Sequence, residues 1–225
     1  MSVVSFGEVL WDMLPSGKKA GGAPMNVAFH LRNFGFQTQL ISRIGKDALG
    51  QELRSFLDSK GIDHSLVQED PEQPTSTVQV TLDAKGHASY EIVQPVAWDF
   101  ITASDAATQA VGKAEALVFG SLAARQAETR STLLHLLDQA SLAVFDVNLR
   151  PPYDDVDLVA DLARHAQLVK LNDHEIARLQ ADGDDLEAAA RALRERCGCR
   201  FVCVTAGARG AGLLHAQDWH WCEPQ

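Results

Sequence analysis

Two adjacent glycines, followed by a proline and an asparagine, form the first segment of this chain that could bind a ligand. Gly21 and Gly22 allow positive φ angles and a close approach of the backbone to a small molecule. Pro24 suits the first turn of a helix, and the apolar residues after it have helical spacing. We therefore predict a helix N-terminus whose N–H groups face a ligand, with Asn26 placed to hydrogen-bond a hydroxyl group. An ordinary loop-to-helix junction is the alternative interpretation.

An aspartate before this turn, Asp12, is predicted to lie past a first strand, at the edge where α/β sheets bind ligands. A turn aspartate is its plainer interpretation.

A second polar group follows the apolar segment Ala143–Phe145. Asp146, Asn148 and Arg150 alternate with apolar residues, so in an extended chain their side chains point to one side. A carboxylate, an amide and a guanidinium would then converge where the sheet opens. The alternative is a polar strand end that caps the next loop.

A third group follows the next two apolar segments. After Leu168 and Val169 come Lys170, Asn172 and Glu175; either Asn172 or Asp173 can cap a helix that has Glu175 in its first turn. The same carboxylate could instead reach Mg²⁺ or its water beside phosphates, and the sequence does not separate the two roles. Thr205 and Gly207 end a further apolar segment and suit a phosphate or a ribose.

The elements that must position these residues alternate between strand and helix patterns, which indicates a mostly parallel sheet flanked by helices. Glu8–Asp12 is predicted to continue a first strand, Ser2–Phe6, and Asp47 is predicted to cap a helix through Leu57. Residues 75–93 break the alternation with a β-hairpin around a turn at 83–86. A hairpin cannot be stable alone, so it must cover the main domain or pair with another copy.

Composition excludes several classes of protein. The 225 residues carry a formal net charge of −10, which argues against nucleic-acid and anionic-membrane surfaces. We expect no signal peptide and no membrane span, hence a cytoplasmic protein. The four cysteines lack metal-binding spacing, and buried reduced thiols are expected. The segment Gly207–Gly212 has strands on both sides, so it is not a dinucleotide fingerprint, and the sequence contains no P-loop motif.

Taken together, the motifs of the chain resemble those of the PfkB (ribokinase-like) carbohydrate kinases, most closely their fructokinase branch. Six motifs occur in the family's order over essentially the whole chain: Glu8-Val-Leu-Trp-Asp12, Gly21-Gly-Ala-Pro-x-Asn-Val-Ala28, Ile44-Gly-x-Asp-x-x-Gly50, Asp146-Val-Asn-Leu-Arg150, Lys170-x-Asn-x-x-Glu175 and Val204-Thr-x-Gly-x-x-Gly210. The resemblance implies one α/β domain over residues 1–225, with the 75–93 hairpin as a small β lid. It also implies a homodimer formed through the lid.

The resemblance implies roles for the polar residues in ATP-dependent phosphorylation of a sugar, with D-fructose converted to fructose 6-phosphate. Sugar-binding residues would be Asp12, Gly21, Gly22, Asn26 and Arg150, with Arg150 also stabilising the transition state. Nucleotide-binding residues would be Lys170, Asn172, Thr205, Gly207 and Gly210. Glu175 would hold Mg²⁺ through water, and a monovalent cation is a further expected cofactor. A 2-keto-3-deoxygluconate kinase and a non-catalytic sugar-binding protein are the alternatives.

One family feature is not found in the sequence. The family's Gly-Ala-Gly-Asp segment supplies the general base and the anion hole, and no counterpart precedes Gln225. The resemblance therefore implies a C-terminally truncated kinase domain whose base lies beyond Gln225.

We expect the 225-residue chain by itself not to phosphorylate fructose at a useful rate, because general-base assistance alone contributes about 10²–10⁴-fold. A coupled ADP-release assay should compare it with a chain extended to the natural stop codon. Equal turnover by the two chains would show that a base lies within residues 1–225.

Overall fold

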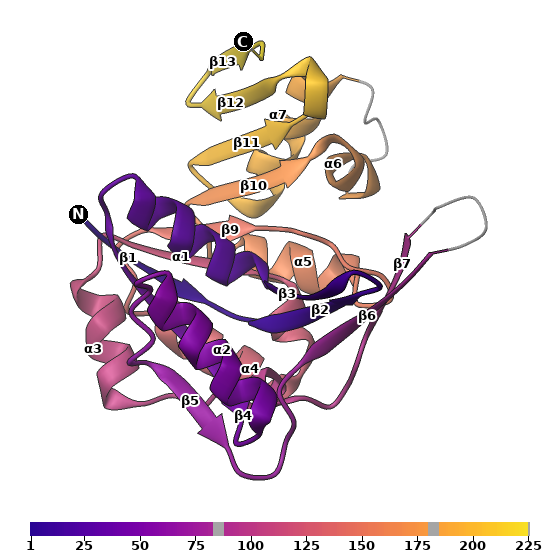
Figure 1. Ribbon diagram of the computed structural model, residues 1–225. Coiled ribbons are helices and arrows are strands. Elements are labelled where there is room, and N and C mark those ends of the chain that lie inside the picture. Colours follow the sequence, from indigo (N-terminus) through magenta and orange to yellow (C-terminus); the bar gives the residue numbers. More distant parts are fainter. Residues whose placement is uncertain (83–87, 180–184, 225) are drawn as a thin grey trace. The chain divides into compact units, whose positions relative to one another are not determined.

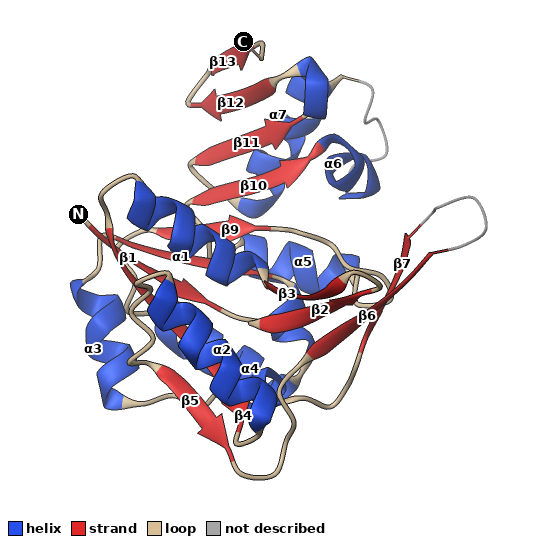
Figure 2. Cartoon of the chain, in the orientation of Figure 1, coloured by secondary structure: helices blue, strands red, loops and turns tan. Residues whose placement is uncertain are grey.

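The structure, a computed structural model, describes residues 1–82, 88–179 and 185–224. The fold is α/β with a mostly parallel sheet flanked by helices, as predicted (Figures 1 and 2). The chain divides into two compact units, one comprising Met1–Leu117 and Ala123–Ala140, the other Val118–Leu122 and Ser141–Gln225. Among the described residues, none of the helices has both the length and the apolar character needed to cross a bilayer.

The first unit contains a parallel strand set with helices packed on it. Its strands follow the order β1 (Ser2–Phe6), β4 (Gln37–Gly45) and β5 (Val67–Asp70). Its helices are α1 (Ala23–Asn33), α2 (Ala48–Ser59), α3 (Asp105–Lys113) and α4 (Ala127–Leu137). Leu40 and Ile44 of β4 are buried in one apolar cluster with Met25 of α1 and with Leu53 and Leu57 of α2. The alternating face of β4 therefore fixes both helices, and α1 carries the predicted glycine turn at its start.

A second, four-stranded sheet in the same unit corrects one prediction and contains the predicted hairpin. Glu8–Asp12 does not continue β1; instead β2 (Leu10–Leu14) and β3 (Gly17–Gly21) form an antiparallel pair. The hairpin is present as β6 (Thr77–Leu82) and β7 (Ala88–Ile92), and its turn lies outside the described residues. Because β2 pairs with β6, the order is β3-β2-β6-β7, so the hairpin is stabilised within its own chain.

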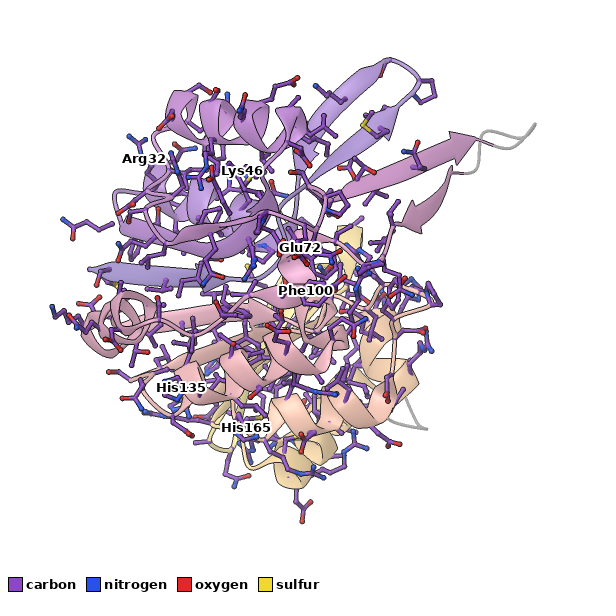
Figure 3. All side chains as sticks on the ribbon, turned by 90° about the horizontal axis from the view of Figure 1, so that it is seen from below. Arg32, Lys46, Glu72, Phe100, His135 and His165 are labelled. Atoms are coloured by element: carbon purple, nitrogen blue, oxygen red, sulfur yellow. The ribbon has the colours of Figure 1, made fainter. Side chains whose placement is uncertain are left out.

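A buried ion pair fixes the chain just after the hairpin. The short helix η1 (Ala97–Phe100) carries Asp99, which is fully buried and accepts from Arg125 at 2.7 and 2.8 Å. The guanidinium also lies 4.0 Å from the centre of the Trp98 ring. Phe100, labelled in Figure 3, accepts a hydrogen bond from Arg43 Nη1 through its carbonyl at 2.8 Å. Removing one member of such a pair leaves an uncompensated buried charge, which is strongly destabilising.

The second unit continues the alternation of strands and helices. Strands β9 (Ala143–Asp146), β10 (Leu168–Asn172) and β11 (Phe201–Thr205) are parallel; β12 (Ala211–His215) is antiparallel to β11, and β13 (Asp218–Cys222) is antiparallel to β12. The helices are α5 (Val156–Ala163), α6 (Asp173–Leu179) and α7 (Leu186–Cys197). Val202, Val204 and Leu214 are fully buried, where α7 packs on β11 and β12. On the opposite face Leu213 remains 36% exposed, so apolar surface is left there.

The cysteines agree with the prediction in part. Cys197 and Cys199 are buried and free, and burial raises the pKa of the Cys199 thiol to about 11. Cys199 is therefore protonated at neutral pH and behaves as a small apolar residue. Cys222 is exposed rather than buried, because it lies on the last strand, β13.

Asp47 is the predicted cap of α2, and the structure confirms it. Its carboxylate accepts from Gly50 N–H at 2.7 Å and also from the N–H and hydroxyl of Thr75, both at 2.8 Å. Burial raises the pKa of Asp47, but the hydrogen bonds from Thr75 and Gly50 outweigh it and hold this pKa below its usual range. One side chain thus joins the start of α2 to the segment that enters β6.

We expect Asp47→Ala to lower the free energy of unfolding by about 1–2 kcal/mol, the upper range for loss of an N-cap. Because the folded-state pKa is lowered, the contribution of the charge is complete above the ordinary aspartate pKa of about 3.9. It is lost as the pH falls through the folded-state pKa. Urea unfolding of both proteins between neutral and acidic pH should show their difference shrinking below that value. Ser104→Ala removes the neutral cap of α3 and should show no such pH dependence; equal pH profiles for the two variants would contradict the assignment.

Candidate functional site

The glycine turn has the conformation that its sequence predicts. Gly22 precedes α1 with φ 113°, and a Cβ built on it would lie 2.4 Å from the carbonyl oxygen of Glu8. Pro24 lies in the first turn of α1, and Asn26 is exposed one turn in, its N–H donating to Gly22 O at 3.1 Å. Only glycine fits at position 22, for reasons of both conformation and space.

Asp12 lies directly against this turn. It is on β2, opposite Lys19 of β3 and Val78 of β6, and is half-buried. A Cβ on Gly21 would lie 2.6 Å from Asp12 Oδ2, so the missing side chain of Gly21 leaves room for the carboxylate. The structure therefore brings Asp12, Gly21 and Gly22 together, although Asp12 reaches them from the second sheet and not from the end of β1.

Glu8 is a residue of this site that the sequence did not single out for a role. It is 2% exposed, and its Oε1 accepts the N–H of Ala23, the first residue of α1, at 3.3 Å. One of the N–H groups predicted to face a ligand is therefore used by the protein, and a carboxylate at a helix N-terminus is favoured by the helix dipole. In the sequence, the signal that could have identified Glu8 was an acidic residue directly after Gly7, at the end of an apolar strand.

In the second unit, the polar groups after β9 and β10 pair differently from the prediction. Val147 and Leu149 are buried while Asn148 and Arg150 are not, so the predicted alternation is present. However, β9 ends at Asp146 and Asn148 has φ 45°, so the backbone leaves the extended conformation. Asp146 pairs with Lys170 Nζ at 2.9 Å, and the exposed Arg150 donates to its neighbouring carbonyl, Leu149 O, also at 2.9 Å.

Glu175 and Asn172 form a reciprocal cap at the start of α6. Asn172 Oδ1 accepts the Glu175 N–H and Glu175 Oε2 accepts the Asn172 N–H, both at 2.8 Å. The other carboxylate oxygen, Oε1, accepts the Leu149 N–H at 2.8 Å, and Glu175 is only 5% exposed. The capping interpretation of this motif is therefore correct, and the glutamate also ties the loop after β9 to α6.

The last group lies at the carboxyl ends of β10 and β11. Asn172 and Thr205 are partners in the parallel register, so their side chains belong to the same edge of the sheet. Gly207 has φ 55° and Gly210 has φ 122°, where a Cβ would lie 2.3 Å from Cys222 O. After Gly210 the chain enters β12 and not a helix, as the sequence predicted.

An ion pair joins this loop to α6. Arg209 Nη2 lies 2.7 Å from Asp173 Oδ2, and the hydrogen bond from Arg209 holds the pKa of Asp173 below its usual range. Lys170, Asn172, Thr205 and Gly207 thus line neighbouring strand ends of the second unit. The set around Asp12 belongs to the first unit.

The residues proposed to bind metal fit an indirect role only. No group of three or more His, Cys, Asp or Glu residues suited to a metal ion occurs in the described part of the chain. Both oxygens of Glu175 already accept backbone N–H groups, and each retains one lone pair. Such a carboxylate can accept a hydrogen bond from a metal-bound water, whereas direct ligation would compete with the cap.

Comparison with known proteins gives one family over nearly the whole chain. The model of the pfkB family carbohydrate kinases matches residues 15–224. A fructokinase of Klebsiella pneumoniae is 31% identical over 231 residues, which cover 96% of this chain and 74% of that protein.

Solved structures give the same fold. The apo crystal structure of fructokinase from Vibrio cholerae O395 has a TM-score of 0.86 and 26% identity, covering 99% of this chain and 80% of that one. A double mutant of that enzyme, with fructose, ADP and potassium ion bound, has a TM-score of 0.84 at 22% identity, covering 99% and 75%. Aminoimidazole riboside kinase from Salmonella enterica has a TM-score of 0.84 at 23% identity, covering 100% and 77%.

We expect Glu175→Gln to destabilise the second unit by about 2–3 kcal/mol. Glutamine keeps one acceptor oxygen, but its NH₂ group would face a backbone N–H that is now accepted by the carboxylate. The urea midpoint of the change in circular dichroism measures this loss. Glu187→Gln, which removes an exposed charge paired with Arg191, is the matched control and should shift the stability by less than about 0.5 kcal/mol. Equal midpoints for the two variants would contradict a capping role for Glu175.

Proposed function

We propose that this chain, which belongs to the PfkB family of carbohydrate kinases, binds ATP and a sugar and serves transfer of the γ-phosphoryl group to a sugar hydroxyl. We propose D-fructose as the sugar and fructose 6-phosphate as the product. The observation that carries the proposal is the placement of the Asp12 carboxylate against Gly21, beside the start of α1. The fructokinases among the relatives support the choice of sugar.

The sugar would be held by the first-unit residues. Asp12 offers a carboxylate as acceptor, and hydrogen bonds to charged groups contribute roughly 1.5–3 kcal/mol each. Asn26 is exposed at the start of α1 and can both donate to and accept from hydroxyl groups. Gly21 and Gly22 would let the sugar approach the backbone closely. Two hydroxyl groups held in this way would fix the orientation of the ring, which is the main requirement for in-line transfer.

The nucleotide would be held by the second-unit residues. Lys170, Asn172 and Thr205 lie on neighbouring strand ends, where α/β folds bind their ligands. Gly207 and Gly210, with positive φ, would let phosphate or ribose approach the backbone. Mg²⁺, when bound, neutralises phosphate charge, and Glu175 would hold it through water. A potassium ion, present in the fructose and ADP complex of the Vibrio cholerae enzyme, is the proposed monovalent cation.

Arg150 is the proposed stabiliser of the transferred phosphoryl group. Among the described residues its exposed guanidinium donates one hydrogen bond, to a neighbouring carbonyl, and a guanidinium with five N–H donors can bind an anion as well. The same availability favours the second candidate, a kinase of 2-keto-3-deoxygluconate, because a sugar carboxylate would pair with this arginine equally well. We assign no general base to a residue of this chain.

We still propose a homodimer, but for a different physical reason than the stability of an isolated hairpin. The hairpin does not need a second copy for stability, because β2 and β3 complete a four-stranded sheet. In the part of the chain that the structure describes, β3 and β7 are the outer strands of this sheet, and outer strands can pair with a strand of another copy. We therefore propose that two copies associate through this sheet.

We expect Asp12→Ala to weaken sugar binding about tenfold or more, because a charge-assisted hydrogen bond is lost. Nucleotide binding should remain within about twofold, since this residue belongs to the other unit. Isothermal titration calorimetry with fructose and with an ATP analogue measures both. Asp138→Ala removes an exposed aspartate after α4 and is the control for general effects of charge. An equal loss of affinity for both ligands would contradict the assignment of Asp12.

A further inference from the structure

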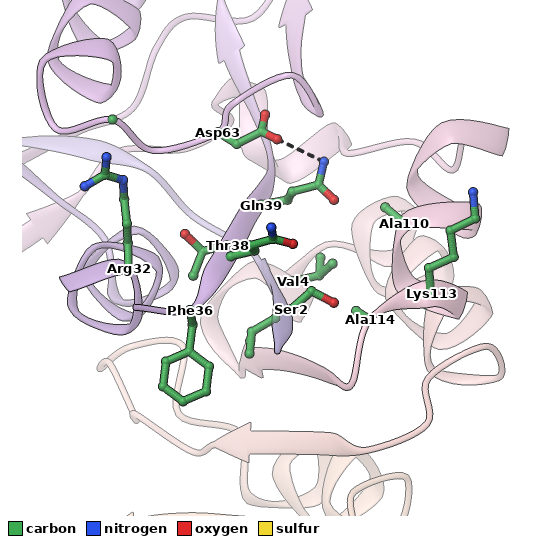
Figure 4. A pocket seen from close by; sticks show the side chains of 13 residues that line it. Ser2, Val4, Arg32, Phe36, Thr38, Gln39, Asp63, Ala110, Lys113 and Ala114 are labelled. Atoms are coloured by element: carbon green, nitrogen blue, oxygen red, sulfur yellow. Dashed lines mark hydrogen bonds between the residues drawn. The ribbon is translucent and has the colours of Figure 1, made fainter. Parts of the chain in front are cut away.

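A cavity of about 600 Å³ lies at the amino-terminal ends of β1 and β4 and is lined in part by Thr38, Gln39 and Asp63 (Figure 4). Arg32 and Lys113 also line it, but each stands in the last turn of a helix, whose partial negative charge offsets part of its own. Asp63 supplies a further negative charge and accepts a hydrogen bond from Gln39 at 3.1 Å. These groups favour no particular ligand, and we assign none to the cavity.

The edge strand β13 has main-chain groups that point away from its own sheet. It ends the strand order of the second unit, and in the described part of the chain it pairs with β12 alone. Main-chain groups point alternately to the two sides of a strand. Phe201 N–H donates to Gln167 O, on the β10 side, at 2.9 Å. Followed outward through the registers of β11, β12 and β13, this alternation turns His220 toward β12 and directs the N–H and C=O groups of Trp219 and Trp221 outward.

The hairpin that carries this edge is fixed to α7. Arg191 of that helix donates to Gln217 O, in the turn before β13, at 2.8 Å. The Trp219 ring occupies the space where a side chain of Gly212 would lie, since a Cβ there would come within 2.1 Å of the ring. This ring therefore leans over β12 and leaves the outward main-chain groups uncovered. A fixed edge loses little conformational freedom when another strand pairs with it, which favours association.

Tryptophans flank His220 on both sides in β13. A second copy that runs antiparallel about a two-fold axis at His220 would place Trp219 of each copy opposite Trp221 of the other. Because both tryptophans direct their main-chain groups outward, each such pair would exchange N–H and C=O groups, and the sheet would continue with both rings on the α7 side. Trp221 is 40% exposed, and aromatic pairs across neighbouring strands stabilise a sheet. The edge is therefore self-complementary.

The charges along the edge also fit a second copy. Asp218 would face Cys222 and Glu223 would face Gln217, so no like charges stand directly opposite each other in this register. Sheet edges are usually protected by lysine, proline or a bulge. Between Asp218 and Cys222 the strand contains neither residue, and its register with β12 is continuous. Pro224 lies just beyond and limits the length that can pair.

We propose that two copies of this chain associate through β13, which extends the sheet of the second unit across a two-fold axis at His220. An edge of five residues is smaller than a standard interface, which buries about 800 Å² per partner. The association is therefore weak and reversible, with a Kd on the order of 0.1 mM. The contact uses no residue of the sheet β3-β2-β6-β7, and it does not depend on the sugar or on the phosphoryl transfer proposed above.

Disulfide trapping tests the register. Asp218 and Cys222 of the second copy would form the closer type of antiparallel pair, with Cα atoms about 4.5 Å apart, a separation that a disulfide can span. Cys222 is exposed and free, so Asp218→Cys at about 0.1 mM should give covalent dimers with diamide as oxidant. Peptide mass spectrometry should find position 218 joined to position 222. The parent chain and Glu195→Cys, a change at an exposed position of α7, should crosslink much more slowly. Dimers joined at other positions, or formed no faster than in Glu195→Cys, would overturn the proposal.

An exchange of charge at His220 tests the axis, because this residue would face its own copy. It is exposed, so its replacement does not put the fold at risk. His220→Lys and His220→Glu should each raise the Kd about fivefold, since like charges then stand opposite each other. An equimolar mixture of the two variants should associate at least as tightly as the parent chain, as measured by sedimentation velocity.

The same two changes at His174, which is exposed on α6, are the matched control and should leave the Kd unchanged. Any pairing through the sheet β3-β2-β6-β7 would be common to all these variants and would not alter the comparison. A mixture of the His220 variants that associates no more tightly than either variant alone would show that the axis does not lie at His220, and the proposal would be wrong.

Discussion

The close contact between Gly22 and the Glu8 carbonyl is the constraint on which the first unit's site depends. Any side chain at position 22 would collide with that carbonyl, so the end of β3 and the start of α1 can approach the segment after β1 only through a glycine. This approach brings the Glu8 carboxylate to the Ala23 N–H, and the packing of Asp12 over Gly21 lies beside it. One short backbone contact therefore determines where a carboxylate and a helix N-terminus lie relative to each other.

Two glutamates near the starts of helices, Glu8 and Glu175, differ in their surroundings from Asp12. Glu8 and Glu175 are both almost fully buried, and both accept backbone N–H groups. Glu175 joins two loops of the second unit through three hydrogen bonds that include its own N–H. Asp12, by contrast, is half-buried on a strand, with part of its surface accessible. Burial therefore distinguishes the two carboxylates that hold the backbone from Asp12, whose side chain is partly accessible.

The sequence was sufficient for features set by local chemistry. The glycine turn, the caps at Asp47 and Asn172, and the strand–helix alternation all follow from residue types over a few positions. It failed where partners are distant along the chain. Leu10–Leu14 looks like a continuation of β1, yet it pairs with β3 and with β6 some 66 residues later, as Trp11 and Thr77 show. The Asp146–Lys170 pair and the cavity beside Thr38 likewise depend on strand register, which periodicity alone does not specify.

The buried Asp99–Arg125 pair has a consequence for how this sequence can change over time. The two charges face each other in the protein interior, so either single replacement leaves a buried charge without this partner. A joint replacement by apolar residues of similar volume avoids that state and can be nearly neutral. Substitutions at these two positions, which are 26 residues apart in the chain, are therefore coupled. We expect related sequences to keep both residues or to replace both together.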